Sequence, residues 1–224
     1  KRVLIQGGGY IAVEFAGIFN GLGADTELVY RKDLFLRGFD LDVRRIVAEQ
    51  VAAKGVELQF NTDINEIEKL ASGEFLVTLN NGEQRRVDAV FSAIGRGAKT
   101  SGLNLENAGV KLDNKGYVAV NAEFQTSTPN VYAVGDVIGR VQLTPVALAE
   151  GMALARHWFD GQPLQVDYEN IPTAVFCQPN IGTVGLTEEQ AREQYEVDIY
   201  ASKFKPMKHA LTGLDEQMFM KLIV

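Results

Sequence analysis

Hydrophobic positions along the 224-residue chain form short runs and spaced repeats that predict an alternating order of strands and helices. A glycine cluster separates the first apolar run from a stretch in which apolar and small residues recur at helical spacing. Predicted strands cover residues 2–6, 26–30 and 56–60, and predicted helices cover residues 10–22 and 40–54. This order is typical of a parallel sheet with crossover helices, so we expect an α/β fold.

An antiparallel insertion is predicted after the third strand. Residues 74–79 and 85–91 alternate between apolar and polar positions, and the sequence Asn-Asn-Gly-Glu lies between them at residues 80–83. Asn-Gly between two alternating segments is a strong hairpin signal. Residues 89–94 then predict the return strand of the parallel sheet.

The second half of the chain predicts a strand, a long helix and then a separate small sheet. The strand covers residues 130–134 and the helix residues 145–159, and a turn-rich linker follows at residues 162–170. Four short strands are expected at residues 173–176, 183–186, 197–204 and 219–224. Before the second half of that sheet, Thr187 and Gln190 fit a capping box at the start of a short helix.

Composition narrows the classes of function. A net charge of -7 argues against a nucleic-acid or anionic membrane surface. One cysteine, Cys177, excludes a disulfide framework or a cysteine zinc site within the chain, and two histidines leave no histidine-rich site, so no metal is expected. No apolar run reaches the roughly 18 residues of a membrane span, and no signal peptide is recognisable. We expect a cytoplasmic protein.

The two ends of the chain predict an internal segment of a longer protein. Lys1 and Arg2 lead directly into an apolar run without an initiator methionine, and residues 219–224 alternate like a strand to the last residue. Native domains rarely begin and end inside strands, because frayed ends lose pairing and burial.

A glycine-rich loop predicts a dinucleotide site. Gly7, Gly9 and Ala12 follow a strand and open a helix: Gly7 allows a tight turn, Gly9 lets the backbone approach a pyrophosphate, and Ala12 lets the helix pack closely. Free N–H groups at the helix start favour the phosphates. The motif alone is weak evidence and also fits a tight turn without a ligand, but its strand-before, helix-after context favours dinucleotide binding.

Two arginines predict which dinucleotide binds. NAD sites place an acidic residue about 20 residues further on, where it accepts the ribose hydroxyls. Here the second strand is followed by Arg31, and Arg37 comes six residues later. Two guanidinium groups suit a dianionic 2′-phosphate, so NADPH is favoured over NADH. The alternative is a solvated basic loop whose arginines pair with Asp33 or Asp40.

The sequence resembles the glutathione reductases, a branch of the flavin-dependent pyridine nucleotide–disulfide oxidoreductases. Residues 7–40 carry the resemblance first, from Gly-Gly-Gly-Tyr-Ile-Ala to Leu-Arg-Gly-Phe-Asp. Further motifs are Ser-Ala-Ile-Gly-Arg at 92–96, Thr-Pro-Asn-Val-Tyr-Ala-Val-Gly-Asp at 128–136, Gln-Leu-Thr-Pro-Val-Ala at 142–147, Ile-Pro-Thr-Ala-Val-Phe at 171–176 and Ile-Gly-Thr-Val-Gly-Leu-Thr at 181–187. The resemblance covers the whole chain.

The resemblance implies three parts and two cofactors. Residues 1–97 would be a Rossmann-like NADPH-binding domain with an antiparallel insertion. Residues 98–168 would be the C-terminal part of an FAD-binding domain, and residues 169–224 the start of an α+β dimerisation domain. The implied activity is an NADPH-dependent flavoprotein disulfide reductase that passes electrons from NADPH through FAD to an active-site disulfide and then to glutathione disulfide. The full-length protein would be a homodimer.

The resemblance also assigns site residues. Tyr10 would cover the flavin until nicotinamide displaces it, and Glu14 would face the flavin; their alternatives are a packing aromatic ring and a solvated side chain. Gly8, Ile11 and Glu14 would line the nicotinamide and pyrophosphate path, and Ala174 would lie near the nicotinamide edge. The expected cofactor-binding residues are Gly7, Gly8, Gly9, Ile11, Glu14, Arg31, Arg37, Gly95, Asp136, Gln142, Thr144 and Ala174.

Departures from the family pattern limit what the chain can do alone. The redox-active cysteine pair, the flavin's own glycine-rich motif and the C-terminal His-Pro have no counterpart in these 224 residues. No catalytic residue is therefore expected in this chain, which we expect to be inactive as a disulfide reductase by itself. Cys177 is expected to be a packing thiol, His157 a structural residue and His209 a surface residue.

The sequence leaves more than one disulfide substrate as an alternative. Met152 stands where some glutathione reductases have an arginine that contacts glutathione. A trypanothione-type or dihydrolipoamide-type reductase is an alternative, although dihydrolipoamide enzymes place an acid where Arg31 stands. A non-catalytic NADPH-binding module is the remaining alternative.

Overall fold

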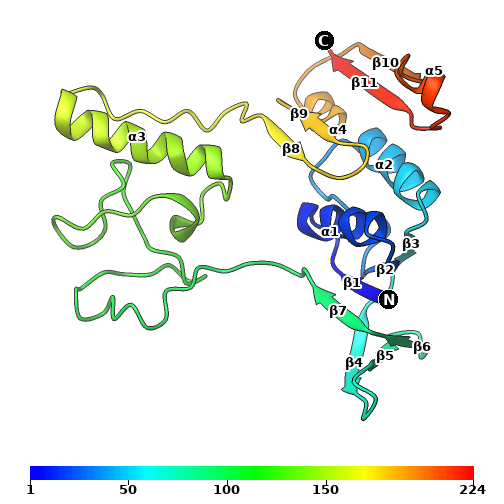
Figure 1. Ribbon diagram of the computed structural model, residues 1–224. Helices are drawn as coiled ribbons and strands as arrows, with labels where there is room; N and C mark the ends of the chain where they lie inside the picture. Colours follow the sequence, from blue (N-terminus) through cyan, green and yellow to red (C-terminus); the bar gives the residue numbers. More distant parts are fainter. The chain divides into compact units, whose positions relative to one another are not determined.

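The computed structural model describes residues 1–224 and divides into two units (Figure 1). The first unit contains residues 1–95 together with residues 170–224, and the second contains residues 96–169. The further division of the first unit into a nucleotide-binding part and a dimerisation part stays a prediction. No helix has both the length and the apolar character needed to cross a membrane.

A four-stranded parallel sheet forms the centre of the first unit. Its strands are β1 (Arg2–Gln6), β2 (Asp25–Tyr30), β3 (Glu57–Phe60) and β7 (Ala89–Ser92), in the order β3-β2-β1-β7. Each neighbouring pair is parallel. All four were predicted from the apolar runs, and only their ends differ. The order is that of one half of a Rossmann sheet, so the predicted α/β class is confirmed.

Two helices connect these strands, and the end of α1 and the start of α2 each have a residue suited to the position. Helix α1 (Tyr10–Gly21) is followed by Gly23, whose φ of +81° is a conformation that glycine adopts at little cost. Helix α2 (Leu41–Ala53) begins after Asp40, whose carboxylate accepts a hydrogen bond from the backbone N–H of Asp42 at 3.0 Å. The sequence therefore defines both helices locally.

The antiparallel insertion has three strands, not the predicted two. They are β4 (Ile64–Lys69), β5 (Phe75–Leu79) and β6 (Gln84–Val87), in the order β4-β5-β6. Strand β4 is almost wholly exposed, so its sequence lacks the apolar alternation that would reveal it. The strand predicted over residues 85–91 is divided at Asp88, because β6 pairs with β5 whereas β7 pairs with β1.

Both faces of the parallel sheet are buried. On one face Val3 and Ile5 pack with α1, α2 and the β8–β9 segment, and on the other face Leu4 packs with side chains from β5 and β6. Successive side chains of a strand point to opposite faces, so each face receives alternate residues. Burial on both faces explains why β1 is a continuous apolar run.

The C-terminal part of the first unit contains two small antiparallel sheets where one was predicted. Its elements are β8 (Thr173–Val175), β9 (Ile181–Thr183), α4 (Glu188–Arg192), β10 (Ile199–Phe204), α5 (His209–Thr212) and β11 (Met218–Ile223). β8 pairs only with β9, and β10 only with β11. The strand predicted at residues 183–186 lies earlier, because the segment that pairs with β8 begins at Ile181. The capping box of Thr187 and Gln190 is confirmed.

The second unit consists of a 3-10 helix, a long helix and extended loops. These helices are η1 (Gly135–Ile138) and α3 (Thr144–Asp160). The strand predicted over residues 130–134 is not formed, since Tyr132 makes only an isolated bridge with Gln125. An extended segment becomes a strand only through pairing, and residues 96–169 contain no strand that could pair with it. Its small core centres on Phe124, Ile138 and Leu154.

Candidate functional site

The glycine loop between β1 and α1 forms a cradle at the carboxyl end of the sheet. Gly7 has a φ of +146°, and its N–H donates to the carbonyl of Val29 at 3.0 Å. A Cβ atom at Gly7 would collide with the carbonyl of Ala93, and one at Gly8 would collide with the ring of Tyr30. These two glycines are required by the fold itself, because neighbouring groups fill the space beside them.

Gly9 differs from its neighbours. No heavy atom lies within 4 Å of the position its Cβ would take, and its φ of -85° is open to any residue. The protein's own packing therefore does not require glycine here. The open space fits the close approach of a ligand's pyrophosphate to the backbone at the start of α1.

A cavity of about 370 Å³ opens over this loop. Its walls come from the ends of β1 and β2, from the loop after β2 and from the segment after β7. The residues that line it are Gln6, Gly7, Gly8, Gly9, Val29, Tyr30, Arg31, Arg37, Asp63, Ala93, Ile94 and Gly95. Six of the expected cofactor-binding residues are thus brought to one cavity: Gly7, Gly8, Gly9, Arg31, Arg37 and Gly95.

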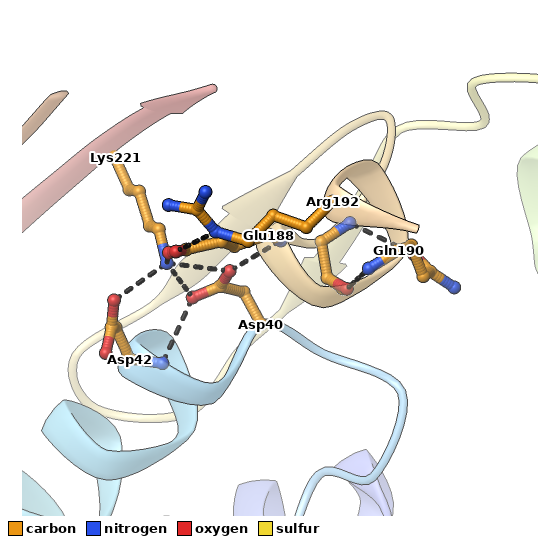
Figure 2. A network of polar contacts seen from close by, with 7 residues as sticks. Asp40, Asp42, Glu188, Gln190, Arg192 and Lys221 are labelled. Carbon is orange, nitrogen blue, oxygen red and sulfur yellow. Dashed lines mark hydrogen bonds and ion pairs between the residues drawn. The ribbon is translucent and has the colours of Figure 1, made fainter. Parts of the chain in front are cut away.

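Arg31 and Arg37 are exposed at this cavity and form no ion pair with any residue of the chain. The alternative in which they pair with Asp33 or Asp40 is not what the structure adopts. Asp40 instead contacts Lys221 of β11 at 2.9 Å (Figure 2). Two guanidinium groups therefore remain available to an anion.

Buried side chains hold in place the loop of residues 31–39, which carries Arg31 and Arg37 and is called the arginine loop below. Phe35 and Leu36 are almost fully buried, and the N–H of Leu36 donates to the carbonyl of Gly8 at 2.7 Å. From α2, Arg44 donates from Nε to the carbonyl of Phe35 at 2.7 Å and from Nη2 to the carbonyl of Leu34 at 2.6 Å. This role of Arg44 was not predicted, because nothing in the neighbouring sequence shows that its side chain turns back to the loop.

Four expected residues, Tyr10, Ile11, Glu14 and Ala174, do not line this cavity. Tyr10 packs at the margin of the core. The Glu14 carboxylate accepts a hydrogen bond at 2.7 Å from the backbone N–H of Phe176, directly after β8. Ala174 is an exposed residue of β8 itself. Glu14 and Ala174 therefore belong to neighbouring segments, and Glu14 is neither free nor merely solvated.

The second unit holds the other three expected residues. Asp136 in η1 pairs with Arg96 at 3.0 Å, and both side chains are about half exposed. Gln142 donates from Nε2 to the hydroxyl of Tyr117 at 3.1 Å. Thr144 is the exposed first residue of α3, where free backbone N–H groups are available.

The buried carboxylate of Glu150 in α3 supports the backbone at Gly135 and Asp136, and this role was not predicted. Glu150 is 1% exposed; Oε2 accepts from the N–H of Gly135 at 2.5 Å, and Oε1 accepts from the hydroxyl of Tyr168 at 2.7 Å. Burial, and then the bond to Glu150, raises the pKa of Tyr168. Because Gly135 precedes Asp136, Glu150 fixes the backbone that presents Asp136. A glutamate in an Ala- and Leu-rich helix gives no sign of this role.

The prediction for His209 was wrong. The side chain is buried, and its Nε2 lies 3.9 Å from Oε1 of Glu216. The segment between β10 and β11 lies against α2, held by a Lys54–Glu216 ion pair at 2.7 Å, and this covers the imidazole.

The predictions for Cys177 and His157 agree with the structure. Cys177 is 1% exposed, and burial raises the pKa of its thiol to about 11, as expected of a packing thiol. Nδ1 of His157 lies 2.9 Å from the carbonyl of Gln162, at the end of α3, which suits a structural residue.

Comparison with known proteins gives matches over nearly the whole chain. Residues 1–151 match the family model described as pyridine nucleotide-disulphide oxidoreductase, and residues 171–224 match the dimerisation domain of the same family. The chain is 46% identical over 224 residues to a glutathione reductase of Burkholderia cepacia, of which it covers 50%. It is 44% identical over 229 residues to a trypanothione reductase of Leishmania donovani, of which it covers 46%.

A solved structure is similar over the same extent. The HOCl-induced flavoprotein disulfide reductase RclA from Escherichia coli superimposes with a TM-score of 0.90 at 31% identity, covering the whole of this chain and 51% of that one. The chain thus spans about half the length of the relatives it matches. With two family models matched in order, the chain belongs to the pyridine nucleotide-disulphide oxidoreductase family.

Proposed function

We propose that this chain supplies the NADPH site and part of the FAD site of an NADPH-dependent disulfide reductase, with glutathione disulfide as its substrate. The observation that carries the proposal is the cavity over the glycine loop, where two unpaired arginines face an open backbone cradle. Glutathione reductases are among the relatives at 46–47% identity and support the choice of substrate. Trypanothione reductases at 41–44% identity are the alternative.

The six expected residues at the cavity have distinct physical roles in an NADPH site. Gly9 leaves room for the pyrophosphate, and the first N–H groups of α1 bind its oxygens. Arg31 and Arg37 bind the 2′-phosphate through charge-assisted hydrogen bonds. The positive φ of Gly95, +148°, lets the backbone after β7 approach the nucleotide. Gly7 and Gly8 keep the turn closed against its neighbours.

The residues that flank α1 are proposed to act at the nicotinamide end. Ile11 and Ala174 would bound the ring, Tyr10 would cover the flavin until nicotinamide arrives, and Glu14 would face the flavin while its bond to Phe176 N–H fixes its orientation. In the second unit Asp136, Gln142 and Thr144 would bind FAD. FAD supplies electron transfer between NADPH and a disulfide when bound.

The whole-protein assignments follow from the same reasoning. We propose residues 1–97 as the NADPH domain, 98–168 as part of the FAD domain and 169–224 as part of the dimerisation domain of a homodimer. The single, buried cysteine leaves this chain without a disulfide partner for electron transfer, so the chain by itself is proposed to bind NADPH without disulfide reduction. A cytoplasmic location is proposed, although a relative from Pisum sativum is named as chloroplastic/mitochondrial.

Titration of the chain with NADPH and NADH, followed calorimetrically, tests the proposal. Arg31→Ala together with Arg37→Ala should weaken NADPH binding by a few kcal/mol, since each charge-assisted bond contributes about 1.5–3 kcal/mol. NADH binding should stay nearly unchanged. Arg45→Ala, an exposed arginine of α2 outside the cavity, is the matched control. Tighter binding of NADH than of NADPH by the unaltered chain would overturn the assignment.

A further inference from the structure

Lys221 of β11 is surrounded by three carboxylates from two other elements. Its Nζ lies 2.9 Å from Asp40, 2.7 Å from Asp42 and 2.6 Å from Oε2 of Glu188, and its side chain is 7% exposed (Figure 2). Burial alone lowers the pKa of a lysine, but hydrogen bonds to the three carboxylates outweigh it here and raise the pKa of Lys221. The ammonium group is therefore a fixed positive charge at the start of α2.

Both carboxylate oxygens of Asp40 accept hydrogen bonds within this network. Both oxygens accept from Lys221 at 2.9 Å; in addition Oδ1 accepts from Asp42 N–H at 3.0 Å and Oδ2 accepts from Glu188 N–H at 3.1 Å. Burial raises the pKa of Asp40, but these hydrogen bonds outweigh it, so the net pKa is lowered and the group is an anion at neutral pH.

This anion lies close to the arginine loop. Asp40 follows Arg37 by three residues, so their Cα atoms are at most about 11 Å apart. Arg37 is exposed at the cavity and forms no ion pair, although Asp40 is only three residues further along the chain. At about 10 Å, two charges near a protein surface still interact by more than thermal energy, and salt screens this only in part.

We propose that Lys221 is a positioning residue of the 2′-phosphate site: by holding Asp40 it keeps Arg37 free to bind the 2′-phosphate of NADPH. The inference rests on the proposed function, in which Arg37 binds that phosphate. Without Lys221, Asp40 and Asp42 would both lose their cationic partner, and Asp40 would be an uncompensated anion three residues from Arg37. It would compete with the phosphate for Arg37 and repel the phosphate directly. The β10–β11 segment therefore contributes to cofactor choice without contacting the cofactor.

Lys221→Met tests the proposal, with the Kd of NADPH and of NADH measured for the 224-residue chain at constant salt. NADPH should bind about 5- to 15-fold more weakly, as expected for one uncompensated charge at this distance. NADH, which lacks the 2′-phosphate, should change less than about twofold. Adding Asp40→Asn should restore NADPH binding, since asparagine still caps α2 but carries no charge. Lys221→Arg should retain the preference.

Lys203→Met is the matched control. Lys203 lies on β10 and pairs with Glu49 of α2 at 3.0 Å, so it also joins this sheet to α2 but lies outside the network. It should leave both Kd values unchanged. Equal weakening of NADPH and NADH by Lys221→Met, without rescue by Asp40→Asn, would show a merely structural tie and overturn the inference.

Two further results keep the test decisive. If Lys221→Met does not fold, the Asp40→Asn variant is compared with the Asp40→Asn, Lys221→Met double variant instead. The two should have the same ratio of NADPH and NADH Kd values. A weaker preference for NADPH in the double variant would contradict the inference. Failure of the proposed function looks different, because the unaltered chain would then not prefer NADPH at all. A chain that prefers NADPH through Arg31 and Arg37 but is insensitive to Lys221 refutes only the inference.

Discussion

Replacing Glu150 with alanine should destabilise the second unit more than any other single carboxylate change in it. The side chain is buried, and it joins α3 to two distant segments through Gly135 and Tyr168. The hydroxyl of Tyr168 also accepts from Arg140 at 3.1 Å, so the carboxylate ends a chain of hydrogen bonds. Alanine would leave the Gly135 N–H without an acceptor in a buried position.

The size of the effect follows from these contacts. A hydrogen bond to a charged group contributes about 1.5–3 kcal/mol, so losing two predicts destabilisation of about 3–6 kcal/mol. Glu150→Gln keeps one acceptor for Gly135 and a donor for Tyr168, and should cost only about 1–2 kcal/mol. Since native domains are stable by only about 5–15 kcal/mol, the alanine variant should lose a large part of the unit's stability.

Urea unfolding followed by tryptophan fluorescence measures this unit selectively. The only tryptophan of the chain, Trp158, lies on α3 and packs edge-on against Tyr132 with ring centroids 4.7 Å apart. Glu123→Ala removes an exposed carboxylate of the same unit and is the matched control. If Glu150→Ala unfolds at the same urea concentration as Glu123→Ala, the buried carboxylate does not stabilise the turn at Gly135 and the reasoning fails.

Further predictions concern the thiol and the glycine loop. With its pKa raised by burial from 9.0 to about 11, Cys177 should react with iodoacetamide at pH 8 at least about a hundredfold more slowly in the folded than in the urea-unfolded chain. Because the folded pKa is the higher one, its contribution to stability is complete below pH 9 and should be lost as the pH rises toward 11; equal urea midpoints at pH 8 and pH 10.5 would contradict this. Gly9→Ala should fold normally but bind NADPH at least tenfold more weakly, as titration would show, because only a ligand needs the space beside Gly9. Gly7→Ala should lower the melting temperature even without ligand, because its Cβ meets the carbonyl of Ala93.

Features encoded by neighbouring residues were predicted well from the sequence. The apolar runs of β1 and β2, the spacing of Gly7 and Gly9, and the capping box at Thr187 each show as a pattern among neighbouring residues. Features that depend on distant partners were missed or misplaced. Strand β4 forms only because β5 lies beside it, and His209 is buried only because the segment around it lies against α2.

The sequence alone determined the family, through its motifs, and the Rossmann order of strands and helices, and it located six of the residues that line the cavity, because periodicity and glycine spacing can be seen locally in a sequence. Only the tertiary structure decided which charges pair. Asp40 was one of the two partners that the alternative interpretation offered the nearby arginines, yet it binds Lys221, which lies 181 residues further along the chain. Glu150 likewise reaches Tyr168 and Gly135 through folding. Side-chain partners are chosen by distance in space, and an isolated sequence does not specify that distance.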